Sequence, residues 1–270
     1  MFGGAMMFPN ASSPEWGKQL INTVATEALR RMFSASESLS VDVRCQSPAQ
    51  LLQGSLDGFR MEGAGLVIRR QFRTASMGFE TDAVAIDFGA AMQGRLALKQ
   101  GTQAIAKVTL AEADLNQAFR APLVTQHLIN RQEPALLEAS GGQPVSFGGI
   151  KLVLGEENSV QLSATVEAIG MEAIPVTLDA TVEVVRRRRI VFANQKFVAE
   201  KTPEELRDRA AVFAKVLGEL LDSMVDLDRF GLDGLTLRLN RLETRDKTLV
   251  FSGYAQIEYI PKVNQQSVAA

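Results

Sequence analysis

The most apolar helical pattern of the chain runs from Thr202 to Val225. Thr202 is a residue type that caps helices, Pro203 suits the first helical position, and Glu205 follows Thr202 by three residues, as in a capping box. Beyond Arg209, apolar residues cover more of the circumference than the single stripe of an amphipathic helix. The pattern therefore predicts a long helix that other elements enclose.

A second helical pattern lies near the N-terminus, from Gly17 to Phe33. Pairs of apolar residues alternate there with pairs of polar residues, which is the spacing of an amphipathic helix. A serine-rich stretch from Ser34 to Ser40 ends the pattern. We expect this helix to pack against another element with its apolar face.

After Leu39 the apolar residues recur at every second position, which indicates β-strands with one buried face. The predicted strands cover residues 41–45, 61–72, 77–88, 96–110, 145–154, 160–168, 176–184, 235–242 and 249–259. On the buried side of the early strands we place Leu66, Ile68, Phe72, Val84, Ile86 and Phe88. Regular alternation of apolar and polar residues is typical of antiparallel sheets that have one wet face.

Two shorter helices are predicted between these groups of strands. The first begins at a capping box formed by Thr109 and Glu112, and the second covers residues 123–137. The glycine-containing stretch 140–144 then breaks the chain. The order of elements predicts an α+β fold in which a long antiparallel sheet curves around the long apolar helix, with the second amphipathic helix at the N-terminus.

The same pattern sets the expected domain limits. We predict one domain over residues 17–261, with halves at 17–139 and 145–261, between flexible tails at 1–16 and 262–270. Residues 1–14 have two interpretations, a frayed tail or a small apolar tag that touches a membrane or a pocket mouth, and we favour the frayed tail.

Composition narrows the class of protein. The chain is 46% hydrophobic and 22% charged with a net charge of −2, which is typical of a globular protein and gives no overall attraction to nucleic acid. The single cysteine, Cys45, excludes an internal disulfide and cysteine-based zinc motifs, and favours a reducing compartment. The first residues carry no basic region and only a short apolar piece, so we expect a cytoplasmic protein that is not secreted.

The sequence contains no catalytic constellation that we can name. His127 is the only histidine, so zinc sets and serine or cysteine triads lack a partner, and no phosphate-binding or nucleophile-elbow motif is present. Glu112, Asp114 and Asn116 have the chemistry of a cation site, but capping explains them better. We therefore expect no enzyme activity, no metal and no cofactor.

The run Arg186, Arg187, Arg188 and Arg189 is the main local charge feature. Successive strand residues point to opposite faces, so the four side chains form one patch only where the strand ends or bulges. Two interpretations stay open: a solubilising sheet edge, or guanidinium groups that bind lipid phosphates at a membrane surface. Aromatic residues do not alternate with these arginines, which argues against a nucleic-acid partner.

The interior also has two interpretations. A sheet wrapped around an apolar helix is either a filled core or a tube with room for a ligand, and burial of apolar area at about 25 cal/mol per Å² favours both. A filled core would suit a scaffold that binds a partner protein through a sheet edge. A tube would suit a protein that binds an acyl lipid.

Several short segments of the sequence resemble those of a known family. They are Val41–Arg44, Leu51–Ile68, Val108–Asn116, Gly142–Val145 and Phe230–Leu239. In this order they are similar to the LmeA-like phospholipid-binding family, and more narrowly to its cyanobacterial branch. The resemblance covers roughly residues 17–261 and implies a tubular lipid-binding fold, with acyl chains between a long helix and a wrapped sheet.

The resemblance implies that some of the apolar residues on the long helix and the strands contact lipid. These are Phe213, Leu217, Leu220 and Leu221 on the helix, and Val84, Ile86, Phe88, Leu178 and Val182 on the strands. The implied partner is a phospholipid or fatty-acyl ligand, which the protein binds and transfers without catalysis. Transient contact with an internal, thylakoid-type membrane or with the plasma membrane would follow, with Arg186–Arg189 as candidate contacts to head groups.

Overall fold

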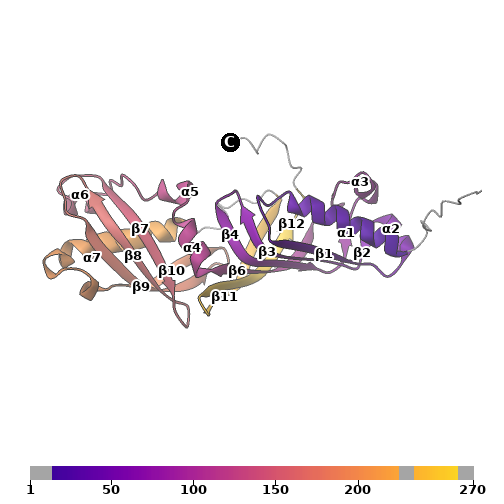
Figure 1. Cartoon of the computed structure of the whole chain (residues 1–270). Coiled ribbons are helices and arrows are strands. Elements are labelled where there is room, and N and C mark those ends of the chain that lie inside the picture. Colours follow the sequence, from indigo (N-terminus) through magenta and orange to yellow (C-terminus); the bar gives the residue numbers. More distant parts are fainter. Residues whose placement is uncertain (1–13, 225–233, 261–270) are drawn as a thin grey trace, which may run out of the picture.

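The computed structural model describes residues 14–224 and 234–260, which form an α+β chain with two main antiparallel sheets (Figure 1). The helices are α1 (Pro14–Arg30), α2 (Pro48–Gln53), α3 (Phe88–Met92), α4 (Glu112–Ala118), α5 (Pro122–Thr125), α6 (Pro134–Ala139) and α7 (Arg207–Met224). The strands are β1 (Ser38–Arg44), β2 (Ser55–Leu56), β3 (Gly58–Ile68), β4 (Phe72–Thr81), β5 (Val84–Ala85), β6 (Thr102–Ala111), β7 (Val145–Leu154), β8 (Ser159–Ala168), β9 (Ile174–Val185), β10 (Arg189–Phe197), β11 (Leu235–Arg245) and β12 (Thr248–Ile257). The α+β class and the antiparallel strands are confirmed.

The two sheets define two lobes that lie end to end in Figure 1. The N-terminal lobe has six strands in the order β1-β3-β4-β6-β12-β11, and α1 packs beside β1. The C-terminal lobe has four strands in the order β10-β9-β8-β7, and α7 packs on β9 and β10. The expectation of a single long sheet around one helix is therefore wrong. Alternation of residues reveals which face of a strand is buried, but it does not say which helix covers that face.

The chain returns to its first sheet at the end. β12 pairs with β6 along ten residues, from Thr248 opposite Ala111 to Ile257 opposite Thr102, and β11 pairs with β12 outside it. The six-stranded sheet therefore contains strands from both predicted halves. The four-stranded sheet, in contrast, is one continuous stretch of the chain, and its first hairpin, with a turn at residues 155–158, forms as predicted.

The long helix begins later than its capping box predicts. Residues 204–206 form a 3₁₀ turn and α7 starts at Arg207. The Thr202 hydroxyl does not cap the helix, because it donates to the carbonyl oxygen of Pro175 at 2.8 Å and ties this segment to β9. The predicted end at Val225 lies outside the described residues.

The second predicted capping box is also absent. Thr109 is a strand residue that lies opposite Ser76 of β4 and Val250 of β12. α4 begins at Glu112, whose Oε2 accepts a hydrogen bond from the backbone nitrogen of Leu154 at 2.8 Å. Thr109 and Glu112 therefore both contact other elements of the fold. The spacing of residues in the sequence cannot reveal such contacts.

Other predicted boundaries shift by a few residues. The N-terminal helix forms as α1 and ends at Arg30 instead of Phe33. Phe88 begins α3 and is not a strand residue. The predicted helix at 123–137 is two short helices, α5 and α6, and each has a proline in its first turn. Proline suits a first helical turn but interrupts the interior of a longer helix.

α4 closes the free edge of the four-stranded sheet. Asn116 Nδ2 donates to the carbonyl oxygen of Leu152 at 2.8 Å, and Asn116 Oδ1 accepts from the Leu152 backbone nitrogen at 2.7 Å. The side-chain amide thereby takes the place of a neighbouring strand, and an edge with paired backbone groups is less prone to recruit another chain. On the same helix, Asp114 forms an ion pair at 2.7 Å with Arg73 of β4, which joins the two lobes.

A second set of hydrogen bonds joins the lobes at the β7–β8 turn. The Asn158 backbone nitrogen donates to Thr244 Oγ1, and the Thr244 backbone nitrogen donates back to Asn158 Oδ1, both at 2.9 Å. Leu239, Leu242 and Leu249, from the six-stranded sheet, are buried in the core of the C-terminal lobe. The lobes therefore share a core at their junction.

Asn116→Ala should destabilise the protein by about 1 to 3 kcal/mol, because it leaves the polar backbone groups of Leu152 without partners at a part-buried position. Urea unfolding measures the change in the free energy of unfolding. Gln117→Ala, at the neighbouring exposed position of α4, is the matched control and should change stability by less than about 0.5 kcal/mol. Equal losses for both variants would contradict this role of Asn116.

Candidate functional site

The N-terminal lobe contains an apolar pocket of about 170 Å³ between the end of α1 and the inner face of the six-stranded sheet. Its walls come from α1 and the residues after it, from β3 and β4, from the segment between residues 84 and 102, and from the end of β12. The lining residues are Leu29, Met32, Phe33, Phe59, Met61, Ile68, Met77, Phe79, Thr81, Val84, Ile86, Leu96, Leu98, Thr102, Ile257, Tyr259 and Ile260. None of them is charged.

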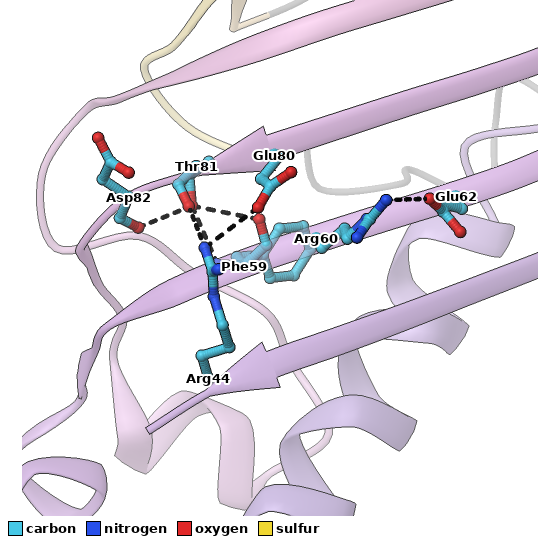
Figure 2. Close-up of polar contacts among 7 residues, drawn as sticks. All are labelled: Arg44, Phe59, Arg60, Glu62, Glu80, Thr81 and Asp82. Atoms are coloured by element: carbon cyan, nitrogen blue, oxygen red, sulfur yellow. Dashed lines mark hydrogen bonds and ion pairs between the residues drawn. The ribbon is translucent and has the colours of Figure 1, made fainter. Parts of the chain in front are cut away.

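Strand alternation explains why the pocket is apolar. Phe59 and Met61 of β3 lie opposite Thr81 and Phe79 of β4, and all four line the pocket. The residues between them are charged and exposed or half-buried on the outer face, where Arg60 pairs with Glu62 at 2.7 Å and Arg44 with Glu80 at 3.3 Å (Figure 2). The two faces of the same strands therefore have opposite character.

Thr81 is a polar residue in this apolar wall, and the backbone occupies its hydroxyl. Thr81 Oγ1 accepts from the Phe59 nitrogen at 3.1 Å and lies 2.9 Å from the carbonyl oxygen of Asp82, as Figure 2 shows. Thr81 is only 3% exposed. Because its hydrogen bonds are made within the protein, the floor of the pocket behaves as an apolar surface toward a ligand.

The pocket is closed at its base and open at its mouth. Met61 and Ile86 are each 2% exposed, so the base is sealed from solvent. Met32 is 39% exposed and Tyr259 is 47% exposed, and both line the same pocket. Large side chains in the wall, such as Phe79 and Leu98, are only half-buried. An apolar wall that is partly exposed to solvent is the arrangement expected where an apolar ligand enters.

The predicted lipid contacts fall into two separate groups. Val84 and Ile86 line the pocket, and Phe88 packs beside it in the same lobe. The residues from α7 and β9 lie in the core of the other lobe; they are Phe213, Leu217, Leu220, Leu221, Leu178 and Val182. Phe213 and Leu217 are 0% and 1% exposed, and none of the six lines the pocket. The structure therefore does not bring the nine residues into one lining.

The residues of the mouth were missed in the sequence. Leu29 lies in the last turn of α1, and Met32 and Phe33 follow the helix. Their apolar character was visible, since it extends the helical pattern to Phe33. The apolar pattern of a helix cannot show whether other elements cover the residues after its end. Their exposure depends on which strands lie opposite in the folded protein.

Arg186, Arg187 and Arg188 form the β9–β10 turn, and Arg189 begins β10. Arg186 and Arg187 have φ angles of 51° and 59°, and both are exposed, whereas Arg188 and Arg189 are half-buried. The Arg187 guanidinium carbon lies 5.8 Å from the ring centre of Tyr254 on β12, and the Leu239 backbone nitrogen donates to the Arg187 carbonyl oxygen at 2.7 Å. The turn therefore packs on the six-stranded sheet, and none of its arginines lines the pocket.

α7 is anchored to β10 through a carboxylate. Asp222 accepts from the Phe192 backbone nitrogen at 2.6 Å and from Gln195 Nε2 at 3.1 Å. Burial raises the pKa of Asp222, and these hydrogen bonds and the charge of Arg189 oppose that rise. The contact fixes the end of α7 and lies in the C-terminal lobe, away from the pocket.

His127 and Cys45 do not line the pocket. His127 is exposed after α5, and Cys45 is buried with its thiol near the carbonyl oxygen of Ser47. Among the described residues, no group of three His, Cys, Asp or Glu side chains could hold a metal ion. The helices within the described ranges also include none with the length and apolar character needed to cross a membrane.

In a comparison with protein families, residues 15–253 match the model described as LmeA-like phospholipid-binding. The chain therefore belongs to the LmeA-like phospholipid-binding family, as the resemblance of its sequence phrases implied. This is a lipid-binding family rather than an enzyme family. Neither the curated proteins nor the solved structures give a match.

Leu217→Trp should destabilise the protein by about 1 to 3 kcal/mol, because the added volume enters a core in which Leu217 is already 1% exposed. Urea unfolding measures this loss. Leu220→Trp is the matched control on the same helix, and its effect should be smaller since Leu220 is only half-buried. A Leu217→Trp variant as stable as the wild type would mean that α7 faces open space.

Asp222→Asn should alter how stability depends on pH. Because the pKa of Asp222 is raised in the folded state, the wild type gains stability from this group as the pH falls and loses that gain as the pH rises through the folded pKa. The variant has no such group. Urea unfolding from about pH 7 to about pH 4 should show the wild type gaining stability relative to Asp222→Asn. A relative loss at low pH would contradict the raised pKa.

Proposed function

We propose that the protein binds a phospholipid or another acyl lipid non-enzymatically, with an acyl chain in the pocket of the N-terminal lobe. The observation that carries the proposal is the pocket itself, which has a lining without charged side chains, a sealed base and a partly exposed mouth. Membership of a phospholipid-binding family supports the same ligand class. Val84 and Ile86 are the contacts expected from the sequence that this site retains.

The energetics of the pocket suit an acyl chain. Each methylene group removed from water contributes about 0.8 kcal/mol, so about six buried methylenes, which a pocket of this size admits, contribute roughly 5 kcal/mol. A chain that comes from a bilayer is already out of water and gains much less. The pocket would therefore hold a lipid firmly in solution and still release it at a membrane, which is the balance that lipid transfer requires.

The wider mechanism is part of the same proposal. We place the protein transiently at a membrane surface, where the pocket mouth exchanges lipid. A tubular lipid-binding arrangement would in this case be formed by α1 and the six-stranded sheet instead of by α7. The exposed Arg186 and Arg187, beside Tyr254, offer a second contact to a membrane surface through cationic and interfacial aromatic side chains.

Met77→Trp should lower the affinity for a fluorescent, acyl-labelled phospholipid at least about tenfold, because the larger ring occupies the pocket. Fluorescence titration measures the binding, and native mass spectrometry of the purified protein detects bound lipid. Ile105→Trp is the matched control, since Ile105 is 61% exposed on the outer face of the same sheet. Equal binding by both variants would argue against this pocket, and no lipid binding by the wild type would refute the proposal.

A further inference from the structure

The end of α1 and the β3–β4 turn are held together at the pocket mouth. The Ser34 backbone nitrogen donates to the carbonyl oxygen of Val67 at 2.7 Å, and the Arg70 backbone nitrogen donates to Ser34 Oγ at 2.9 Å. The Val67 nitrogen donates to the carbonyl oxygen of Ala35 at 2.8 Å. These bonds fix two segments that are far apart in the sequence as neighbours.

Each of these segments carries a pair of exposed arginines next to lining residues. Arg30 and Arg31 stand between Leu29 and Met32, which both line the pocket. Arg69 and Arg70 directly follow Ile68, which also lines it. We call Arg30, Arg31, Arg69 and Arg70 the arginine rim. Positive charge therefore borders a pocket whose own lining is uncharged.

The carboxylates near the rim are already engaged. Glu27 pairs with Arg30 at 2.5 Å. Glu37 and Asp114 both bind Arg73, at 2.6 and 2.7 Å, and the hydrogen bond that Arg73 donates to Glu37 raises the pKa of Arg73. Within the described ranges, no carboxylate forms an ion pair with Arg31 or Arg69. The rim therefore keeps positive charge that is available to an anionic ligand.

The backbone conformation of the β3–β4 turn does not account for the presence of arginine at both of its central positions. Arg69 and Arg70 have φ angles of 49° and 58°, and the Gln71 nitrogen donates to the carbonyl oxygen of Ile68 across them. This is a turn of two left-handed residues, for which asparagine and glycine are the favoured residue types. The turn leaves both arginine side chains exposed, directly after the lining residue Ile68.

We propose that the arginine rim binds the anionic head group of the lipid, a phosphate or a carboxylate, while the acyl chain occupies the pocket. The inference rests on the proposed function and adds the chemical class of the head group and its binding site. Guanidinium groups suit this role because their planar set of donors matches the oxygen atoms of a phosphate or a carboxylate. A neutral lipid with the same chains would bind more weakly.

The test compares two acyl-labelled lipids with identical chains, a phosphatidylglycerol and a diacylglycerol, which has no phosphate. The wild type should bind the phosphatidylglycerol more tightly, by about tenfold at low salt, and added salt should reduce the difference. The double variant Arg31→Gln with Arg69→Gln should lose this preference and keep its affinity for diacylglycerol. The matched control is Arg120→Gln with Arg245→Gln, two exposed arginines that lie outside the rim and do not line the pocket, and it should keep the preference.

The outcomes separate the two proposals. Equal binding of both lipids by the wild type, or an unchanged preference in the rim variant, would overturn the arginine rim and leave the lipid pocket intact. Binding of neither lipid would overturn both. Inorganic phosphate is the final probe: tight binding of phosphate alone would indicate an anion site independent of lipid, and overturn the inference. Circular dichroism and urea unfolding verify that the variants fold.

Discussion

The pairing of β12 with β6 is the interaction on which the rest of the structure depends. It returns the end of the chain to the first sheet over ten residues, and the two ends of β12 then serve different lobes. Leu249, at its start, is buried in the C-terminal core, whereas Ile257, at its end, lines the pocket. One strand therefore completes a filled core and an open pocket, and the loss of its pairing would disturb both.

The two lobes are built from similar elements, but one has a filled core and the other has a pocket. Each has an antiparallel sheet and one long helix, yet α7 packs across two strands, β9 and β10, and buries Phe213, Leu217 and Leu221 against them. α1 packs beside the edge strand β1 and leaves apolar residues of β4 and β12 half-covered. Helix position, rather than helix hydrophobicity, separates a core from a pocket here. This explains why the more apolar helix is not the one at the pocket.

Much of the fold could be predicted from residue patterns. The alternation in β8 and β9 and the turn at residues 155–158 identify a hairpin and its neighbour, because these contacts are local in sequence. The candidate site was only partly predictable. Val84 and Ile86 are buried in the N-terminal lobe, whereas Leu217, which the prediction places with them, lies in the core of the other lobe. Apolar character indicates that a residue is buried, but it does not indicate in which lobe the residue is buried.

The sequence by itself determined the α+β class, the antiparallel strands and the family, since each depends on local periodicity or on the order of short phrases. Only the tertiary structure decided which elements meet. Thr202 and Glu112 have the spacing of helix caps, but they bond to Pro175 and Leu154 because those partners lie close after folding. The pocket and its arginine rim arise in the same way, from segments that only the folded chain places side by side.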